Sequence, residues 1–112
     1  MKYALLIYSS DAEFDGLSEA EQNAIFGEYA AISQSPAVVG GSQLQPADTA
    51  TTVRVDNGRT LTTDGPFPET KEALGGYYMV EADNLDAVLE IAARIPAARR
   101  GGGVEVRPVV ER

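Results

Sequence analysis

Residues 3–8, Tyr-Ala-Leu-Leu-Ile-Tyr (YALLIY), decide how the rest of the chain is interpreted. The run is short and rich in β-forming residues, so it predicts a strand. Successive side chains of a strand point to opposite faces, and both faces are apolar here: Tyr3, Leu5 and Ile7 on one, Ala4, Leu6 and Tyr8 on the other. Because a strand that is apolar on both faces is normally covered on both, the fold must place something against each side.

Two helices are predicted outward from this strand. Ser18 and Glu21 have the spacing of a capping box, and two acidic residues in the first turn suit the helix dipole. The first helix has a predicted buried stripe of Ile25, Tyr29 and Ile32. A second helix begins after a cap at Asp83 or Asn84 and stops before Pro96. Its predicted buried stripe comprises Leu85, Val88, Leu89 and Ala92.

Residues 51–63 (TTVRVDNGRTLTT) predict a β-hairpin. Asn57-Gly58 is the dipeptide that tolerates positive φ at both central turn positions. This turn sets the cross-strand pairs Val55–Thr60, Arg54–Leu61 and Val53–Thr62. Neither face of the ribbon is apolar enough to form a core, so we expect an edge ribbon or flap.

Further strands are predicted at residues 76–82 and 104–110, with a weaker one at 38–44. The order is then β-α-β, a hairpin, and β-α-β. It predicts an α+β protein of one domain, residues 1–112, with the ferredoxin-like βαββαβ arrangement and an inserted β-hairpin. Right-handed crossovers place both helices on one face of an antiparallel sheet.

The other face of this sheet is left open by two helices alone. Yet the first strand is apolar on that side, and Tyr77, Tyr78 and Met79 add bulk. A second copy of the same sheet would cover it, so we expect a symmetric homodimer with facing sheets.

The composition narrows the classes of function. A formal net charge of −8 repels phosphate backbones and anionic lipids, so we expect no direct nucleic-acid partner and no membrane. The chain has no cysteine and no histidine, which excludes thiolate chemistry and removes the usual proton carrier near neutral pH. The opening MKYALLIYSS lacks the long apolar region of a signal peptide, so we expect a cytoplasmic protein.

The most distinctive segment is residues 63–72, TDGPFPETKE. Asp64 lies between the hairpin and a Gly-Pro turn. Its carboxylate either accepts backbone amides of the turn or belongs to a site that binds a cation or moves a proton. Lys71 is either solvated or paired with Asp64 or with an anionic ligand. Phe67 either packs into the core or offers a ligand a stacking surface.

These residues and their flanks resemble the YCII-related family, in the branch named for its DGPF motif. The resemblance extends from MKYALLIYSS through GGSQLQP and TTVRVDNGRTLTTDGPF to the last strand, so it covers essentially the whole chain. It implies a ferredoxin-like fold and a dimeric α+β barrel, with no known activity for this branch. Relatives often sit beside, or are fused to, extracytoplasmic-function sigma factors. Some members of the wider family have a proposed His–Asp catalytic pair, which this chain cannot assemble.

The open sheet face supplies the other candidate residues. Glu105 and Arg107 share one face of the last strand, where Tyr8 and Tyr77 are expected to join them. They either form ordinary cross-strand pairs or line a cavity between the two sheets, in which the Arg107 fork would grip an acid group.

Three functions remain open from the sequence. The favoured one is a module that binds a small molecule in the dimer cavity, with a possible regulatory link to a sigma factor. The second is an enzyme with Asp64 as base and Tyr8 or Lys71 as partner. The third is a purely structural dimer. Asp64, Glu69 and Glu72 would suit a hard cation, but nothing in their spacing demands one, so neither metal nor cofactor is predicted.

Overall fold

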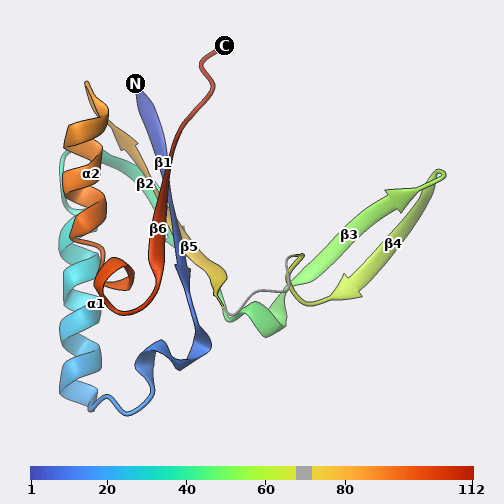
Figure 1. The fold of residues 1–112 in the computed structure, drawn as a ribbon, viewed down its shortest axis with the longest axis horizontal. Coiled ribbons are helices and arrows are strands. Elements are labelled where there is room, and N and C mark those ends of the chain that lie inside the picture. Colours follow the sequence, from blue (N-terminus) through green and yellow to red (C-terminus); the bar gives the residue numbers. More distant parts are fainter. Residues whose placement is uncertain (68–71) are drawn as a thin grey trace.

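The computed structural model describes residues 1–67 and 72–112. It alternates strands and helices in the predicted order (Figure 1). The main sheet is formed by β1 (Lys2–Ser9), β2 (Val38–Gln43), β5 (Ala73–Glu81) and β6 (Gly103–Pro108). The helices are α1 (Glu19–Ser33) and α2 (Leu85–Ala93), with short 3-10 turns η1 (Asp11–Phe14), η2 (Ala47–Thr49) and η3 (Pro96–Arg99). Strands β3 (Thr51–Asp56) and β4 (Arg59–Asp64) form a separate ribbon.

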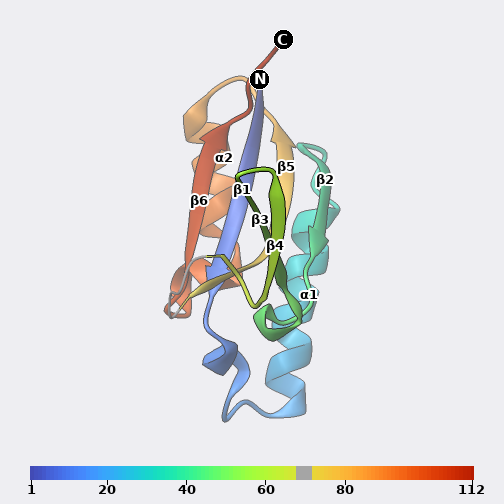
Figure 2. The ribbon, with the colours of Figure 1, turned by 90° about the vertical axis from the view of Figure 1, so that its right-hand side faces the viewer.

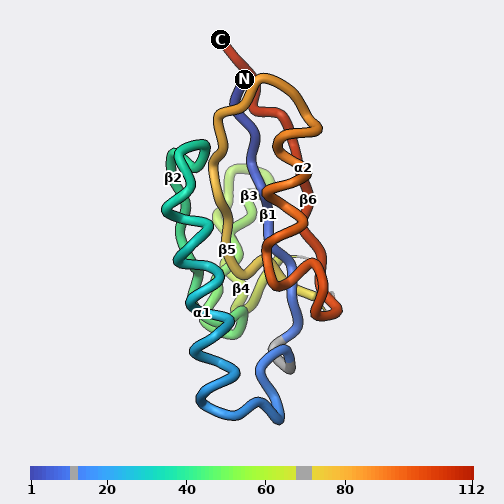
Figure 3. Tube along the Cα trace, turned by 90° about the vertical axis from the view of Figure 1, so that its left-hand side faces the viewer, coloured from blue at the N-terminus to red at the C-terminus, as the bar shows by residue number. Residues whose placement is uncertain are grey.

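The main sheet has the strand order β2-β5-β1-β6, and each neighbouring pair is antiparallel. Strand β1 is therefore an inner strand, hydrogen-bonded to β5 on one edge and to β6 on the other. Both helices lie on the same side of the sheet (Figures 1 and 3). The predicted ferredoxin-like α+β arrangement is confirmed.

Helix α1 begins where the sequence indicated. The Ser18 hydroxyl accepts the Glu21 backbone N–H at 3.1 Å, and the Glu21 carboxylate accepts the Ser18 N–H at 3.3 Å. This reciprocal capping box satisfies amides that have no partner within the helix. Ile25 and Ile32 are buried against the sheet, with Tyr29 half-buried between them.

Helix α2 buries Val88 and Ala92 of the predicted stripe but not Leu85 and Leu89. Val88, Ile91 and Ala92 are buried, whereas Leu85 and Leu89 are about half exposed. The inward side chains follow an i, i+3, i+4 spacing that continues to Ile95, which is fully buried at the start of η3. Anchoring at Ile95 turns the face carrying Leu85 and Leu89 away from the core.

The core lies between the helices and one face of the sheet. Tyr3, Leu5 and Ile7 of β1 point into it, and so do Tyr78 and Val80 of β5. Tyr78 was expected to add bulk to the open face, but it lies on the opposite side because residues 76, 78 and 80 alternate with Tyr77 and Met79.

The open face of the sheet carries half-buried apolar side chains, although neither described helix covers it (Figure 1). Leu6 lies opposite Tyr77 of β5 and Glu105 of β6 in the ladder. The neighbouring row aligns Ala4 with Met79 and Arg107. An apolar centre bordered by charges on β6 thus faces away from the helices.

Strands β3 and β4 form an arm that stands away from the sheet on its open side (Figures 1 and 2). Its cross-strand pairs are those predicted, Val53–Thr62, Arg54–Leu61 and Val55–Thr60. Asn57 and Gly58 take φ of 49° and 76°, which confirms the tight turn. Most of its side chains are exposed, including Val53 and Val55.

Candidate functional site

The DGPF segment meets the open side of the sheet at a cavity of about 470 Å³, which we name the loop cavity. Its wall is formed by the end of β1, the start of β5, the segment around η2 and the turn after β4. The principal residues lining it are Tyr8, Pro46, Pro66, Phe67, Glu72 and Leu74. Of the predicted site residues, the structure therefore brings Tyr8 and Phe67 together.

A β-bulge sets the position of Tyr8. Ile7 pairs with Gly76 but Tyr8 pairs with Leu74, so Gly75 is the extra residue on β5. A bulge bends its strand and redirects the neighbouring side chains. It brings Tyr8 and Leu74 to the same wall of the loop cavity.

Backbone hydrogen bonds hold the turn that carries the DGPF motif. The Gly65 N–H donates to the Ala50 carbonyl at 2.7 Å, and the Thr52 hydroxyl donates to the Gly65 carbonyl at 2.7 Å. Gly65 has φ of 102°, a conformation open to glycine and costly for other residues. The glycine and its two bonds direct Pro66 and Phe67 toward the cavity.

Phe67 is not a core residue, which corrects one of the two expectations for it. Its side chain is 64% exposed, and the Arg54 guanidinium lies 4.5 Å from its ring centroid. This cation–π contact joins the arm to the DGPF turn. The ring therefore forms part of the cavity wall and has a free surface.

The predicted acid–base residues are not assembled by the described part of the chain. Asp64 is exposed at the end of β4, where it pairs with Thr51, and it is not among the described residues that line the loop cavity. Lys71 and Glu69 lie outside the described residues.

Glu105, Arg107 and Tyr77 share the open face with Leu6 but lie farther along the sheet than the loop cavity. Arg107 Nε lies 3.4 Å from Glu105 Oε2. The two side chains are 69% and 48% exposed, so this ion pair adds little to stability. It forms a polar border to the apolar face.

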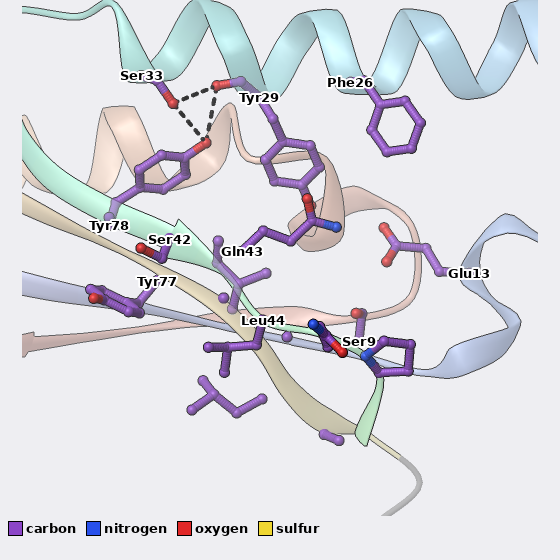
Figure 4. Close-up of a pocket in the computed structure, with 18 of the residues that line it drawn as sticks. Ser9, Glu13, Phe26, Tyr29, Ser33, Ser42, Gln43, Leu44, Tyr77 and Tyr78 are labelled. Carbon is purple, nitrogen blue, oxygen red and sulfur yellow. Dashed lines mark hydrogen bonds between the residues drawn. The ribbon is translucent and has the colours of Figure 1, made fainter. Parts of the chain in front are cut away.

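A larger cavity of about 1090 Å³ lies between α1 and the β2 side of the sheet (Figure 4). We name it the helix-side cavity. It shares the wall made by residues 44–47, 73 and 74 with the loop cavity. Sequence reasoning missed it, because the stripe of α1 marked Tyr29 only as a core residue and no motif surrounds Glu13.

A hydrogen-bond triangle fixes the α1 wall of the helix-side cavity (Figure 4). The Tyr78 hydroxyl donates to the Tyr29 carbonyl at 3.0 Å, and the Ser33 hydroxyl lies within hydrogen-bond distance of both. Burial raises the pKa of the Tyr29 phenol to about 12, and the negative charge of Glu13 adds to this effect.

Two further features bear on the class of protein. Within residues 1–67 and 72–112, no cluster of three or more metal-ligating side chains could hold a metal ion. Neither described helix has the length and apolar character needed to cross a membrane.

The fold and the DGPF turn define a class of α+β protein that comparisons with known proteins identify further. The family model of the YCII-related domain matches residues 1–112. An uncharacterized protein of Rhizobium meliloti (strain 1021) is 32% identical over 114 residues, covering 97% of this chain and 92% of its relative. The chain belongs to the YCII-related family.

Proposed function

We propose that the protein binds a small molecule on the open sheet face, in a cavity that a second copy closes. The observation that carries this proposal is the loop cavity, where Tyr8 from the sheet and Phe67 from the DGPF turn line one space. Binding sites commonly combine an apolar wall with a few polar groups, and Tyr8 and Glu72 are polar residues of this lining.

Two features favour a second copy as the cover. Leu6, Tyr77 and Met79 lie on a face that neither of the described helices covers, and burying them against an identical face would exclude water from their apolar surface. The arm offers a second argument, because an isolated two-stranded ribbon is marginally stable at best. A partner packed on the open side would contact the arm as well as the sheet.

Native mass spectrometry of protein purified from cells tests the binding function. We expect a small molecule to remain bound to the wild type and to be lost from Phe67→Ala. The matched control is Leu85→Ala, an exposed apolar residue of α2 that lines neither cavity. If the wild type carries no small molecule from cells or from a metabolite library, the proposal is wrong and a purely structural dimer is favoured.

Acid–base catalysis with Asp64 as the base is the competing function. Its support is the position of Asp64, two residues before the cavity-lining Pro66. Asp64→Asn separates the two functions because it removes the base and keeps the shape of the side chain. A binding module keeps its ligand in this variant, whereas an enzyme binds substrate but loses turnover.

A regulatory link to an extracytoplasmic-function sigma factor is suggested by relatives in the branch that this chain resembles, which often sit beside, or are fused to, such factors. The net charge of −8 disfavours direct contact with DNA, so the link would act through the sigma-factor protein. Co-purification of the tagged protein with a sigma factor encoded beside it tests this. Failure to associate, with unchanged transcription of that factor's targets on deletion, would remove the proposed link.

A further inference from the structure

The helix-side cavity has a simple electrostatic composition. Among the described residues that line it, Glu13 is the only one with a formal charge at neutral pH. The remaining lining combines aromatic and aliphatic side chains, such as Phe26 and Leu44, with neutral polar groups, such as Ser42 and Gln43. A single carboxylate in such a setting favours a cation over an anion.

The Glu13 carboxylate is not satisfied by the described part of the chain. Its Oε1 atom is buried and has no hydrogen-bond partner there. Buried polar atoms are nearly always hydrogen-bonded, and leaving one unpaired is destabilising, more so for a charged group. The Glu13 carboxylate therefore keeps hydrogen-bonding capacity that the described residues do not use.

The arginines near Glu13 are directed elsewhere. Arg100 Nη2 donates to the backbone carbonyl of Glu13 at 3.5 Å and makes no ion pair with its carboxylate among the described residues. Arg99 is paired with Glu28 of α1. Burial is the larger cause of the raised pKa of the Tyr29 phenol, and the charge of the Glu13 carboxylate adds to it.

Aromatic rings provide the complementary apolar surface. Phe14 and Phe26 lie with centroids 5.6 Å apart and planes tilted by 33°. Phe26 is 47% exposed, so its ring is available to a ligand. Glu13 directly precedes Phe14 in η1, and both residues line the cavity, so a charge and an apolar wall lie at the same end of it.

We propose that the helix-side cavity binds a small organic cation, an amine attached to an apolar body. The ammonium group pairs with the Glu13 carboxylate, and the apolar body lies against Phe26 and Leu44. The cavity volume of about 1090 Å³ accommodates a molecule of this size. The overall charge of −8 further raises the local concentration of cations. This site adjoins the loop cavity across the shared wall of residues 44–47, 73 and 74, but it does not depend on the function proposed there.

A titration with 2-phenylethylamine tests the charge requirement, with 2-phenylethanol as the neutral probe. Nuclear magnetic resonance of ¹⁵N-labelled protein reports where each probe binds. We expect the amine to shift the amide signals of Gly41 and Ser42, which line the cavity, and to leave that of Gly103 on β6 unchanged. The alcohol should bind at least about tenfold more weakly, since it lacks the charge-assisted bond.

Variants separate this site from changes in total charge. Glu13→Gln should weaken amine binding about tenfold or more, whereas Glu90→Gln, an exposed acid of α2, should leave it unchanged. Phe26→Ala should weaken both probes and Phe67→Ala neither. If Glu13→Gln does not fold, the amine–alcohol comparison and Phe26→Ala still decide.

Several outcomes would overturn the inference. These are equal binding of amine and alcohol, full amine binding by folded Glu13→Gln, no binding of the amine, or shifts confined to the loop cavity. None of them bears on whether the loop cavity holds its own ligand, because Phe67→Ala tests that site alone.

Discussion

Replacing Gly102 with alanine should destabilise the protein through one steric contact. A Cβ atom at this position would lie 2.3 Å from the Tyr8 carbonyl oxygen and 3.1 Å from that of Ala97. Both neighbours are backbone atoms, so neither can rotate away as a side chain would. The Gly102 N–H also donates to the Ala97 carbonyl at 3.0 Å, which fixes the glycine in place.

The magnitude follows from the cost of overpacking. Forcing a methyl group into a closely packed site typically costs about 1–3 kcal/mol. An unfolding entropy of about 2.1 cal/mol/K per residue gives roughly 0.24 kcal/mol/K for this chain of 112 residues. The melting temperature of Gly102→Ala should therefore fall by about 4–12 °C.

Gly103→Ala is the matched control, because nothing lies within 4 Å of a Cβ atom at that position. Alanine replaces glycine there without strain, and the stiffer unfolded chain should leave stability equal or slightly higher. Scanning calorimetry on both variants measures the contrast. If Gly102→Ala melts together with Gly103→Ala and the wild type, the packing of this turn against the end of β1 is wrong.

Three other changes follow from the structure. Ser18→Ala removes the cap of α1 and should lower the free energy of unfolding in urea by about 1 kcal/mol; an unchanged midpoint would contradict the capping box. Gly58→Ala places a side chain at φ of 76°, so amide hydrogen exchange should accelerate in the arm while β1 stays protected, and equal acceleration in both would refute the arm's independence. The Tyr29 phenol keeps its proton to about pH 12 in the folded chain but only to about pH 10 in the unfolded chain, so it should favour folding below pH 10 and lose this effect between pH 10 and 12. The loss of stability over this window should therefore be smaller in Tyr29→Phe than in the wild type. Identical pH profiles of stability for the two proteins would contradict the raised pKa.

The sequence predicted the fold well where local signals were strong. The YALLIY run, the Ser18–Glu21 capping box and the Asn57-Gly58 turn each act over a few residues. The strand at β1, the capped start of α1 and the register of the arm are confirmed. Such features are encoded by neighbouring residues, so no distant contact is needed to infer them.

The predictions of side-chain burial failed where a contact with a residue outside the local pattern sets the direction of the side chain. Periodicity alone chose Leu85 and Leu89 for the buried stripe of α2, but Ile95 in the following turn sets the helix rotation. Phe67 looked apolar enough for the core, yet the Gly65 turn directs it outward beside Arg54.

The candidate sites were predictable only in part. Tyr8 and Phe67 line one cavity. Both could be chosen from the sequence, Phe67 from the DGPF motif and Tyr8 from the pattern of the first strand. The helix-side cavity gave no signal, since Glu13 and Tyr29 come from separate elements that meet only in the folded chain. A lone acid in a short turn is not distinguishable from a solvated one by sequence.

Sedimentation equilibrium at micromolar concentration tests the central claim, that a second copy covers the open sheet face. We expect a species of twice the 11.9 kDa chain mass for the wild type, and a single-chain species for Leu6→Lys, whose charge would sit at the centre of that face. A wild-type protein that sediments as one folded chain, with Leu6→Lys indistinguishable from it, would contradict the account.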